Sequence, residues 1–454
     1  MKNIYYASDY AVLDSHVEKG GGTDDTAALQ SILDKARDGR TPVRLVMDGA
    51  ALITGLVIWP NTTIECINPS CGFFLADGSN RALLRNGDPD FYGERRDKNI
   101  TISGGTWNHN ARGQEHHIEL PGDPYEEHLK RNHFSYLVTE CKHIFAFEFY
   151  GVENVTMRDM TVMNQRTYVM LMANFRFVTI ENVNVVLRDY MSANNQDGFH
   201  FWGPGQFLTL RNLTGTAGDD FIALAPDEAD GKSSITDVMI DGVHLNDSDQ
   251  GIRLLSRGEG VLDRVLIKNV TGTYRGLGFI INPWFPGPGG RVRNVVFDTV
   301  ELRCIEPAYD YIDPFLFKLG GNIENLTLRH IHFHADVPAW LIDAGGHYMR
   351  RMPSDEENPT LIDNLSLENV YIHGDPFTHD YVRIRDRVNT LTVRNALITG
   401  GADRKGAFIT GAEKGSVGSL IIDGFTAEGM ETLCSDDLAE GADEVTESRV
   451  NVRS

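Results

Sequence analysis

The sequence predicts an all-β fold, a single-stranded right-handed parallel β-helix of about 10–12 coils with an N-terminal capping helix. Three observations predict it. A nine-residue pattern recurs along most of the chain at intervals of roughly 29 residues. A second column of short apolar strands lies between its copies. Glycine, at 45 of 454 residues, suits a chain with many tight turns. Coils stacked at about 4.8 Å would make a rod on the order of 50 Å long.

The nine-residue pattern alternates apolar and polar residues, which is typical of a strand with one buried face. Its copies begin at Asn99, Asn154, Phe177, Phe207, Asp237, Arg264, Asn294, Asn325, Asn364, Thr390 and Ser419. A β-sandwich or a propeller is the alternative. A propeller blade needs about 40–50 residues and four strands, whereas this repeat supplies two or three strands.

The second column consists of short apolar strands, one between successive copies of the pattern. They begin at Phe145, Tyr168, Gly198, Phe221, Gly251, Gly278, Phe315, Trp340, Val382 and Ala407. One coil cannot bury its apolar face alone, so stacking is expected to give one continuous core.

The N-terminal segment has a different pattern. Residues 20–36 begin with turn residues, and Thr23 or Asp24 can cap a helix in which Leu29, Ile32 and Leu33 follow helical spacing. We therefore expect one domain over residues 1–454. It has a cap with a helix over 1–40, coils over 41–430 with an insertion near 104–133, and a C-terminal tail or cap over 431–454.

Composition excludes several functions. The formal charge of −22 disfavours nucleic acid and anionic membranes as partners, because both would repel the chain. No apolar run reaches about 18 residues, so no membrane-spanning helix is expected. The N-terminus lacks a secretory signal, which predicts a cytoplasmic protein, or a secreted or periplasmic one if a signal has been removed. The five cysteines are scattered, which argues against a disulfide framework and a zinc site.

The candidate chemistry lies in three aspartates. Asp197 and Asp220 open equivalent strands 23 residues, or one coil, apart, and Asp219 adjoins the second. Crowded carboxylates cannot all ionise freely, so at least one pKa should rise. A protonated carboxyl can then protonate a glycosidic oxygen while an ionised one activates water. The alternative is that these aspartates only close turns between coils.

At these motifs the sequence resembles glycoside hydrolase family 28, the polygalacturonase-like members of the pectin-lyase-like β-helix superfamily. NNQDGFHF over residues 194–201 resembles the family's N-T-D-G-I-D-I strand, and GDDFIAL over 218–224 resembles its G-D-D-C-I-A-I strand. The GGTDDTAALQ start is also similar. The resemblance implies that Asp219 is the general acid and that Asp197 and Asp220 activate water, giving inversion.

Two positions depart from the family pattern. Where the family has G-H-G-I-S-I, this chain reads DQGIRLL, with Gln250 at the histidine. Where the family has R-I-K, it reads GFIINP, with Ile280 and Asn282 at the basic positions. Because an ionised uronate is best met by charge-assisted hydrogen bonds, these changes disfavour plain polygalacturonate as the substrate.

Other polar and aromatic residues are candidates for binding a glycan. Strand alternation points His200 and Arg253 outward beside the aspartates, and Trp202 and Trp284 are candidates for stacking on a sugar. With Gln250 and Asn282 they form the expected substrate-binding set. The alternatives are solvated charges for Arg253 and His200 and loop packing for Trp284.

Two further groups are expected to have no chemical role. Lys318, Arg383 and Arg385 should also point outward on later coils, most simply as solvated charges. The histidines of the insertion lack the spacing of a metal site, so the insertion is expected to wall one end of the groove; they are His109, His116, His117, His128 and His133.

The sequence thus predicts a glycoside hydrolase acting on an oligo- or polysaccharide, pectin-like or another acidic glycan, without cofactor or metal. Self-association is a possible further property, as elongated β-helices associate. Two rivals remain. A polysaccharide lyase or epimerase on the same fold would need a basic group to abstract a proton, and a glycan-binding β-helix would hold its ligand without cleaving it.

Overall fold

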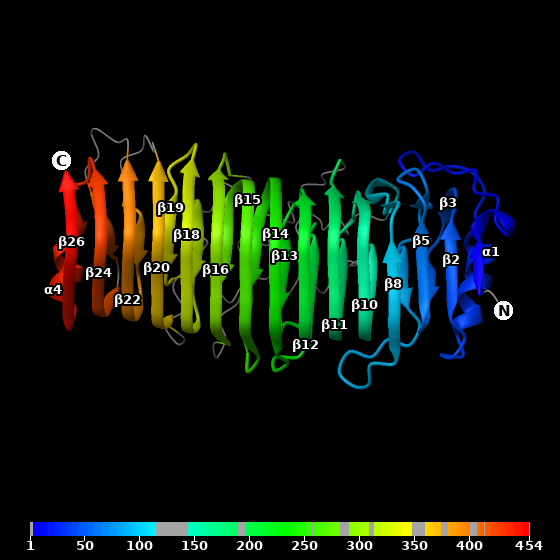
Figure 1. Cartoon of the computed structure of the whole chain (residues 1–454), viewed down its shortest axis with the longest axis horizontal. Helices are drawn as coiled ribbons and strands as arrows, with labels where there is room; N and C mark the ends of the chain where they lie inside the picture. The colour runs from blue at the N-terminus through cyan, green and yellow to red at the C-terminus, as the bar shows by residue number, and fades with distance from the viewer. Residues whose placement is uncertain are drawn as a thin grey trace, which may run out of the picture.

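The computed structural model describes residues 3–114, 144–188, 196–256, 258–281, 290–307, 313–346, 359–373, 380–399, 406–412 and 414–453. Within these residues, 26 strands form one continuous sheet, and every pairing in it is parallel; the sheet winds into a rod with the two termini at opposite ends (Figure 1). The predicted parallel β-helix is confirmed.

The first coils are built from short strands. They are β1 (Ile4–Tyr6), β2 (Val43–Met47), β3 (Ala50–Ile53), β4 (Leu56–Ile58), β5 (Thr62–Cys66), β6 (Gly72–Leu75), β7 (Leu84–Asn86), β8 (Asp97–Ser103) and β9 (Thr106–Asn108). The central coils contain longer strands, apart from one of six residues. They are β10 (Phe147–Met163), β11 (Met170–Val186), β12 (Phe199–Gly215), β13 (Asp220–Ala225), β14 (Ile235–Leu254) and β15 (Val261–Ile281).

The C-terminal coils alternate long and short strands. They are β16 (Arg291–Cys304), β17 (Phe315–Leu319), β18 (Asn322–Ala335), β19 (Trp340–Ala344), β20 (Leu361–His373), β21 (Val382–Ile384), β22 (Arg387–Thr399), β23 (Ala407–Gly411), β24 (Ser416–Glu428), β25 (Thr432–Cys434) and β26 (Glu444–Arg453). The predicted repeats therefore stack copy on copy, with Asn325 of β18 opposite Asn364 of β20.

The asparagines that open many repeats have a structural reason. Asn99, Asn154 and Asn294 have φ values of 59°, 58° and 43°, in the left-handed region that asparagine tolerates well. Their side chains also bond from coil to coil: Asn154 Nδ2 donates to Asn99 Oδ1 at 2.8 Å, and Asn325 Nδ2 donates to Asn294 Oδ1 at 3.2 Å. The bend that turns the chain between sheets is thus held by the same residue type in successive coils.

The core is the continuous stack that the alternation predicts. Phe279, Phe297 and Phe317 come from three consecutive strands and pack with ring centroids 4.7–5.3 Å apart. All three are fully buried. Each buried aromatic ring removes a large apolar area from water, so contact between coils supplies much of the stability of the rod.

The N-terminal end of the rod is covered by α1 (Thr26–Leu33), which buries Leu29, Ile32 and Leu33 as expected. The helix begins at Thr26, and its cap residue is Asp25 rather than Thr23 or Asp24. The Asp25 side chain makes no capping hydrogen bond to the helix, because its carboxylate accepts the backbone N–H groups of residues 12 and 13, at 2.8 and 2.9 Å. Asp24 instead accepts the N–H of Thr26 at 2.9 Å.

The coils continue past residue 430. After the short helix α4 (Asp436–Glu440), β26 pairs with β24 as the last rung of the rod, within the segment expected to be a tail or cap (Figure 1). Six of its residues in succession, 444–449, are exposed, so this strand ends the ladder with a largely polar surface.

The insertion begins later than the sequence suggests. β9 pairs with β6 and β10, so residues 104–108 belong to a regular coil. His109 is fully buried; its Nδ1 accepts the N–H of Arg166 at 3.0 Å, and burial lowers its pKa to about 4. It is a core histidine held by backbone groups. The other four histidines of the insertion lie outside the described residues.

Candidate functional site

The carboxylates occupy neighbouring rungs of one sheet. Asp197 lies two residues before β12, and the N–H of the intervening Gly198 donates to the carbonyl of Asp220 on β13 at 2.9 Å. Asp220 is in turn opposite Gln250 on β14. The structure therefore brings Asp197, Asp220 and Gln250 together on three successive strands, because their spacing equals whole coils.

Several polar atoms of this row are buried without a bonding partner. Asp197, Asp220 and Gln250 are 2%, 6% and 6% exposed. Asp197 Oδ1, Asp220 Oδ1 and Gln250 Oε1 accept no hydrogen bond from the described part of the chain. Buried polar atoms are nearly always satisfied within a folded protein, so a cluster of such atoms indicates a place where a ligand or water supplies the missing bonds.

Asp219 is the most open of the three aspartates. It is half-buried, and its Oδ1 accepts hydrogen bonds from Gln250 Nε2 and, at 3.1 Å, from the N–H of Asp220. Gln250, the residue at the family's histidine position, is thus a donor to the carboxylate for which the resemblance implies the acid role.

His200 links two carboxylates. Its Nδ1 lies 2.8 Å from Asp197 Oδ2, and its Nε2 lies 2.8 Å from Glu228 Oε2. Glu228 also accepts the indole N–H of Trp202 at 2.8 Å. Sequence reasoning missed Glu228. It follows β13 in a turn, belongs to no repeat column, and carries no motif that would mark it.

An aromatic group borders the carboxylates. The Tyr168 ring stacks on His200 with centroids 4.6 Å apart, and Phe145 stacks on Tyr168 at 4.7 Å. Trp202 stands almost perpendicular to His200, at 6.2 Å and 87°. His200 is 4% exposed, so it is neither a solvated charge nor an isolated one.

Burial and charge shift the pKa values here. Burial, with a contribution from Asp219, raises the pKa of Asp197 to about 7, although the hydrogen bond from His200 acts in the opposite direction. Burial raises the pKa of Asp220 well above its ordinary value, and Arg253 only partly opposes it. Burial alone would lower the pKa of His200, but Glu228 and Asp197 outweigh it and raise that pKa to about 10.

Arg253 lies on the next rung, opposite Ala223 of β13, which is itself opposite His200. It is 4% exposed rather than solvated. The small Ala223 side chain lies between His200 and Arg253 in this row of the sheet. The guanidinium of Arg253 is therefore on the same face as the imidazole of His200, one strand beyond Asp220.

The remaining sequence candidates divide. Asn282 and Trp284 lie outside the described residues. Lys318, Arg383 and Arg385 point outward but are not solvated: Lys318 is fully buried, and its Nζ donates to Asp343 Oδ2 at 2.6 Å. The expectation of solvated charges was wrong for these residues, because Asp343 on the strand between Lys318 and Arg383 pairs with them; the distance from Arg383 Nε to Asp343 Oδ1 is 2.8 Å.

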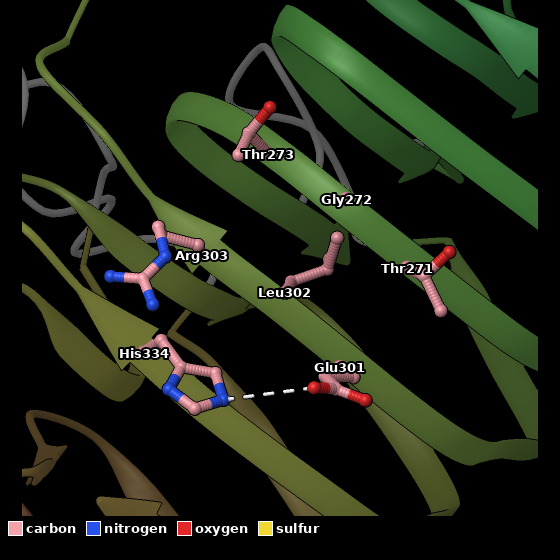
Figure 2. Close-up of a pocket in the computed structure, with 7 residues that line it drawn as sticks. All are labelled: Thr271, Gly272, Thr273, Glu301, Leu302, Arg303 and His334. Atoms are coloured by element: carbon pink, nitrogen blue, oxygen red, sulfur yellow. Dashed lines mark ion pairs between the residues drawn. The ribbon is translucent and has the colours of Figure 1, made fainter.

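A separate hollow of about 420 Å³ lies on the surface of β15, β16 and β18; it is lined by Thr271, Gly272, Thr273, Glu301, Leu302, Arg303 and His334 (Figure 2). In it His334 Nε2 faces Glu301 Oε1 at 4.0 Å (Figure 2). Its lining includes none of the buried, unsatisfied oxygens of the carboxylate row, so we place the site at the carboxylates.

The raised pKa of Asp220 predicts a stability effect. When the pKa of a carboxyl is raised above its ordinary 3.8 in the folded state, the folded protein loses stability as the pH rises from 3.8 toward the folded-state pKa. The side chain introduced by Asp220→Asn cannot ionise, so this variant is expected to raise the unfolding temperature. The increase should be larger at about pH 8 than at about pH 5. Thermal unfolding at both pH values measures this; an equal or opposite change at the two values would contradict it.

Comparisons with known proteins establish the fold. No protein-family model matches the sequence, and no curated protein sequence is significantly similar. The A-module of the mannuronan C-5 epimerase AlgE4 from Azotobacter vinelandii is 13% identical with a TM-score of 0.53, and the alignment covers 98% of this chain and 100% of that one. The family 28 exopolygalacturonase of Yersinia enterocolitica is 14% identical with a TM-score of 0.52, covering 96% and 78%.

A third structure, the catalytic domain of a GH87 α-1,3-glucanase in complex with nigerose, is 11% identical with a TM-score of 0.54, covering 93% of this chain and 66% of that one. In the described residues, no helix is long and apolar enough to cross a membrane. At these identities the likeness concerns architecture, and the chain has the pectin-lyase-like parallel β-helix fold that these structures share.

Proposed function

We propose that the protein is a glycoside hydrolase that cleaves an oligo- or polysaccharide with inversion, through Asp197, Asp219 and Asp220. One observation carries this proposal. Two buried carboxyls with unsatisfied oxygens lie on adjacent strands, and a third, more open carboxyl adjoins one of them. Environments that separate the pKa values of neighbouring carboxyls supply an acid and a base at one pH.

The roles follow from exposure and contacts. Asp219 is the carboxyl most open to solvent, so a glycosidic oxygen can reach it, and we assign it the general-acid role. Asp197 and Asp220 hold and activate the attacking water with their unsatisfied Oδ1 atoms. Asp197 is the base of the pair, since the bond from His200 favours its carboxylate form.

The substrate class follows from the groups around the carboxylates. Arg253 offers a guanidinium one strand beyond Asp220, suited to a carboxylate or sulfate of an acidic glycan. Trp202, partly exposed, offers an aromatic edge beside the same site. Gln250 completes the polar lining with its unsatisfied Oε1.

Product analysis on plant, algal and bacterial glycans tests the proposal. New reducing ends on an acidic glycan are the expected result, and NMR of the first product should show the inverted anomer. A retained anomer would contradict the assignment of a water-activating pair. Binding of a glycan with no product from any substrate in the panel would instead indicate a binding protein.

A second candidate is a lyase or epimerase that abstracts a proton next to a uronate carboxylate. Tyr168 and His200 favour it, because they bring a phenol and an imidazole into the carboxylate patch. Against it, burial raises the pKa of Tyr168 well above its ordinary value, which weakens the phenol as a source of phenolate. Ultraviolet absorbance of an unsaturated product, or deuterium uptake at C5 from heavy water, would establish this candidate instead.

The pH profile of hydrolysis is a further prediction. If Asp197 acts as base while Asp219 keeps its proton, kcat/KM should rise about tenfold per pH unit up to about 7, and it should fall again at the pH where Asp219, the general acid, ionises. The sign follows because only the ionised carboxylate accepts the proton of water. Initial rates over the acid range measure this. A limb centred near the ordinary value for aspartate would exclude Asp197 as the group that titrates.

A further inference from the structure

We infer that Glu228 is a positioning residue that keeps His200 in its imidazolium form and, through it, keeps Asp197 ready as the ionised base. The inference deepens the proposed function and rests on it for the role of Asp197. We call the three groups Asp197, His200 and Glu228 the clamp.

The geometry of the imidazole carries the first step. Both ring nitrogens of His200 lie 2.8 Å from carboxylate oxygens. A neutral imidazole has one N–H and can donate only one hydrogen bond, whereas the imidazolium donates two. Two ionised carboxylates accept only, so both contacts are made at once when His200 carries the second proton.

Trp202 shows that Glu228 Oε2 is an acceptor and carries no proton. Its indole N–H can only donate, and it donates to the same Oε2 atom that His200 faces, at 2.8 Å. That oxygen therefore accepts two hydrogen bonds. An ionised carboxylate oxygen is suited to accept both, whereas a protonated one would have to turn its own hydrogen toward a group that already donates.

The charges around the imidazole act in the same direction. Asp197 and Glu228 contact it directly, and Asp219 and Asp220 belong to the same patch on the next rung. These are four carboxyl groups. On its other side His200 stacks on the ring of Tyr168, whose phenol pKa is raised, and Arg253 lies two strands away, beyond Ala223. The two carboxylates in direct contact, Asp197 and Glu228, outnumber the other nearby cation in the described residues, Arg253, so a protonated imidazole is favoured even though it is buried.

Glu228 has the position of a support rather than of a reacting group. It lies in the turn after β13 and reaches back to the rung of β12, where it holds His200 and Trp202 together. Without the negative charge of Glu228, the imidazole of His200 loses one of its two fully charged acceptors. The proton on His200 is then held less tightly, and the hydrogen bond that favours ionised Asp197 weakens.

The test is Glu228→Gln, which keeps the shape and an acceptor oxygen but removes the charge. NMR of ¹⁵N-labelled histidine, with His200→Asn to assign the signal, reports the imidazole directly. The wild type should show two protonated ring nitrogens through neutral pH. In Glu228→Gln the pKa of His200 should fall by about 1–3 units, the usual effect of one opposite charge in contact.

Two further readouts separate positioning from mere support. The acid limb of kcat/KM should move to higher pH in Glu228→Gln, because the stabilisation of ionised Asp197 by His200 that is weakened is larger than the repulsion from Glu228 that the variant also removes. Trp202→Phe, which removes only the indole donor, is the matched control and should leave the imidazole protonated. A neutral imidazole in the wild type at neutral pH, or an unchanged titration in Glu228→Gln, would overturn the inference.

The NMR titration needs no turnover, so the two proposals can fail separately. If the titration behaves as expected but no glycan is cleaved, the clamp stands and the hydrolase assignment fails. If glycans are cleaved but the acid limb of kcat/KM does not move in Glu228→Gln, the hydrolase assignment stands and the positioning role of Glu228 is wrong.

Discussion

Asp219→Asn is expected to lower kcat for glycosidic cleavage by about 10²–10⁴-fold, the usual contribution of a positioned general acid. The amide cannot deliver a proton to the leaving oxygen. Its oxygen can still accept the hydrogen bond from Gln250 Nε2, so the fold and substrate binding should be retained. Reducing-end assays at saturating substrate measure the change, and KM should change little by comparison.

The leaving group supplies the control for this experiment. An aryl glycoside with an acidic phenol needs little protonation, so Asp219→Asn should retain much more of the wild-type rate on it than on the glycan. Asp423→Asn, far along the chain on β24 and bonded to Arg449 at 2.8 Å, should not change either rate. Equal losses on both substrates would show that Asp219 is not the acid, and the same test applied to Asp220→Asn would then decide whether Asp220 is.

The fold was predictable from the sequence because a β-helix repeats one local rule. Period-2 burial, seen in β18 with Leu326 and Leu328 inward and again with Ile331 and Phe333, is a property of neighbouring residues. The bend residues are also local, since Asn154 occupies a backbone region that few residue types enter readily. Coil order and parallel pairing then follow from stacking equivalent copies.

The site was predictable only where its residues are spaced by whole coils of the repeat. Asp197 and Asp220 are one coil apart in sequence and so fall on adjacent strands. Glu228 lies in a turn whose path depends on tertiary packing, and no spacing predicts its contact with His200. The buried charges were misjudged for another reason: alternation shows that Lys318 points outward, but not that Asp343 lies opposite it on the next strand.

Asp343→Ala should be the most destabilising of the changes considered, by about 3–5 kcal/mol, because it leaves buried cations without their anion. Lys318 Nζ donates to Asp343 Oδ2 at 2.6 Å and to the carbonyl of Gly345. Arg383 Nε donates to Asp343 Oδ1 at 2.8 Å, and Arg385 lies 3.7 Å from its Oδ2. One 3%-exposed carboxylate thus serves three cations, and urea unfolding measures its loss.

The matched control removes the same residue type from an exposed ion pair. Asp336 pairs with Arg303 at 2.7 Å, but the two side chains are 53% and 47% exposed, so Asp336→Ala should cost about 0–1 kcal/mol. Adding Lys318→Met to Asp343→Ala should recover part of the lost stability, since it removes the fully buried ammonium that the single variant leaves unpaired. If Asp343→Ala cost no more than Asp336→Ala, the buried cluster would hold its cations through backbone carbonyls alone, and Asp343 would not be the group that makes burial of Lys318 tolerable.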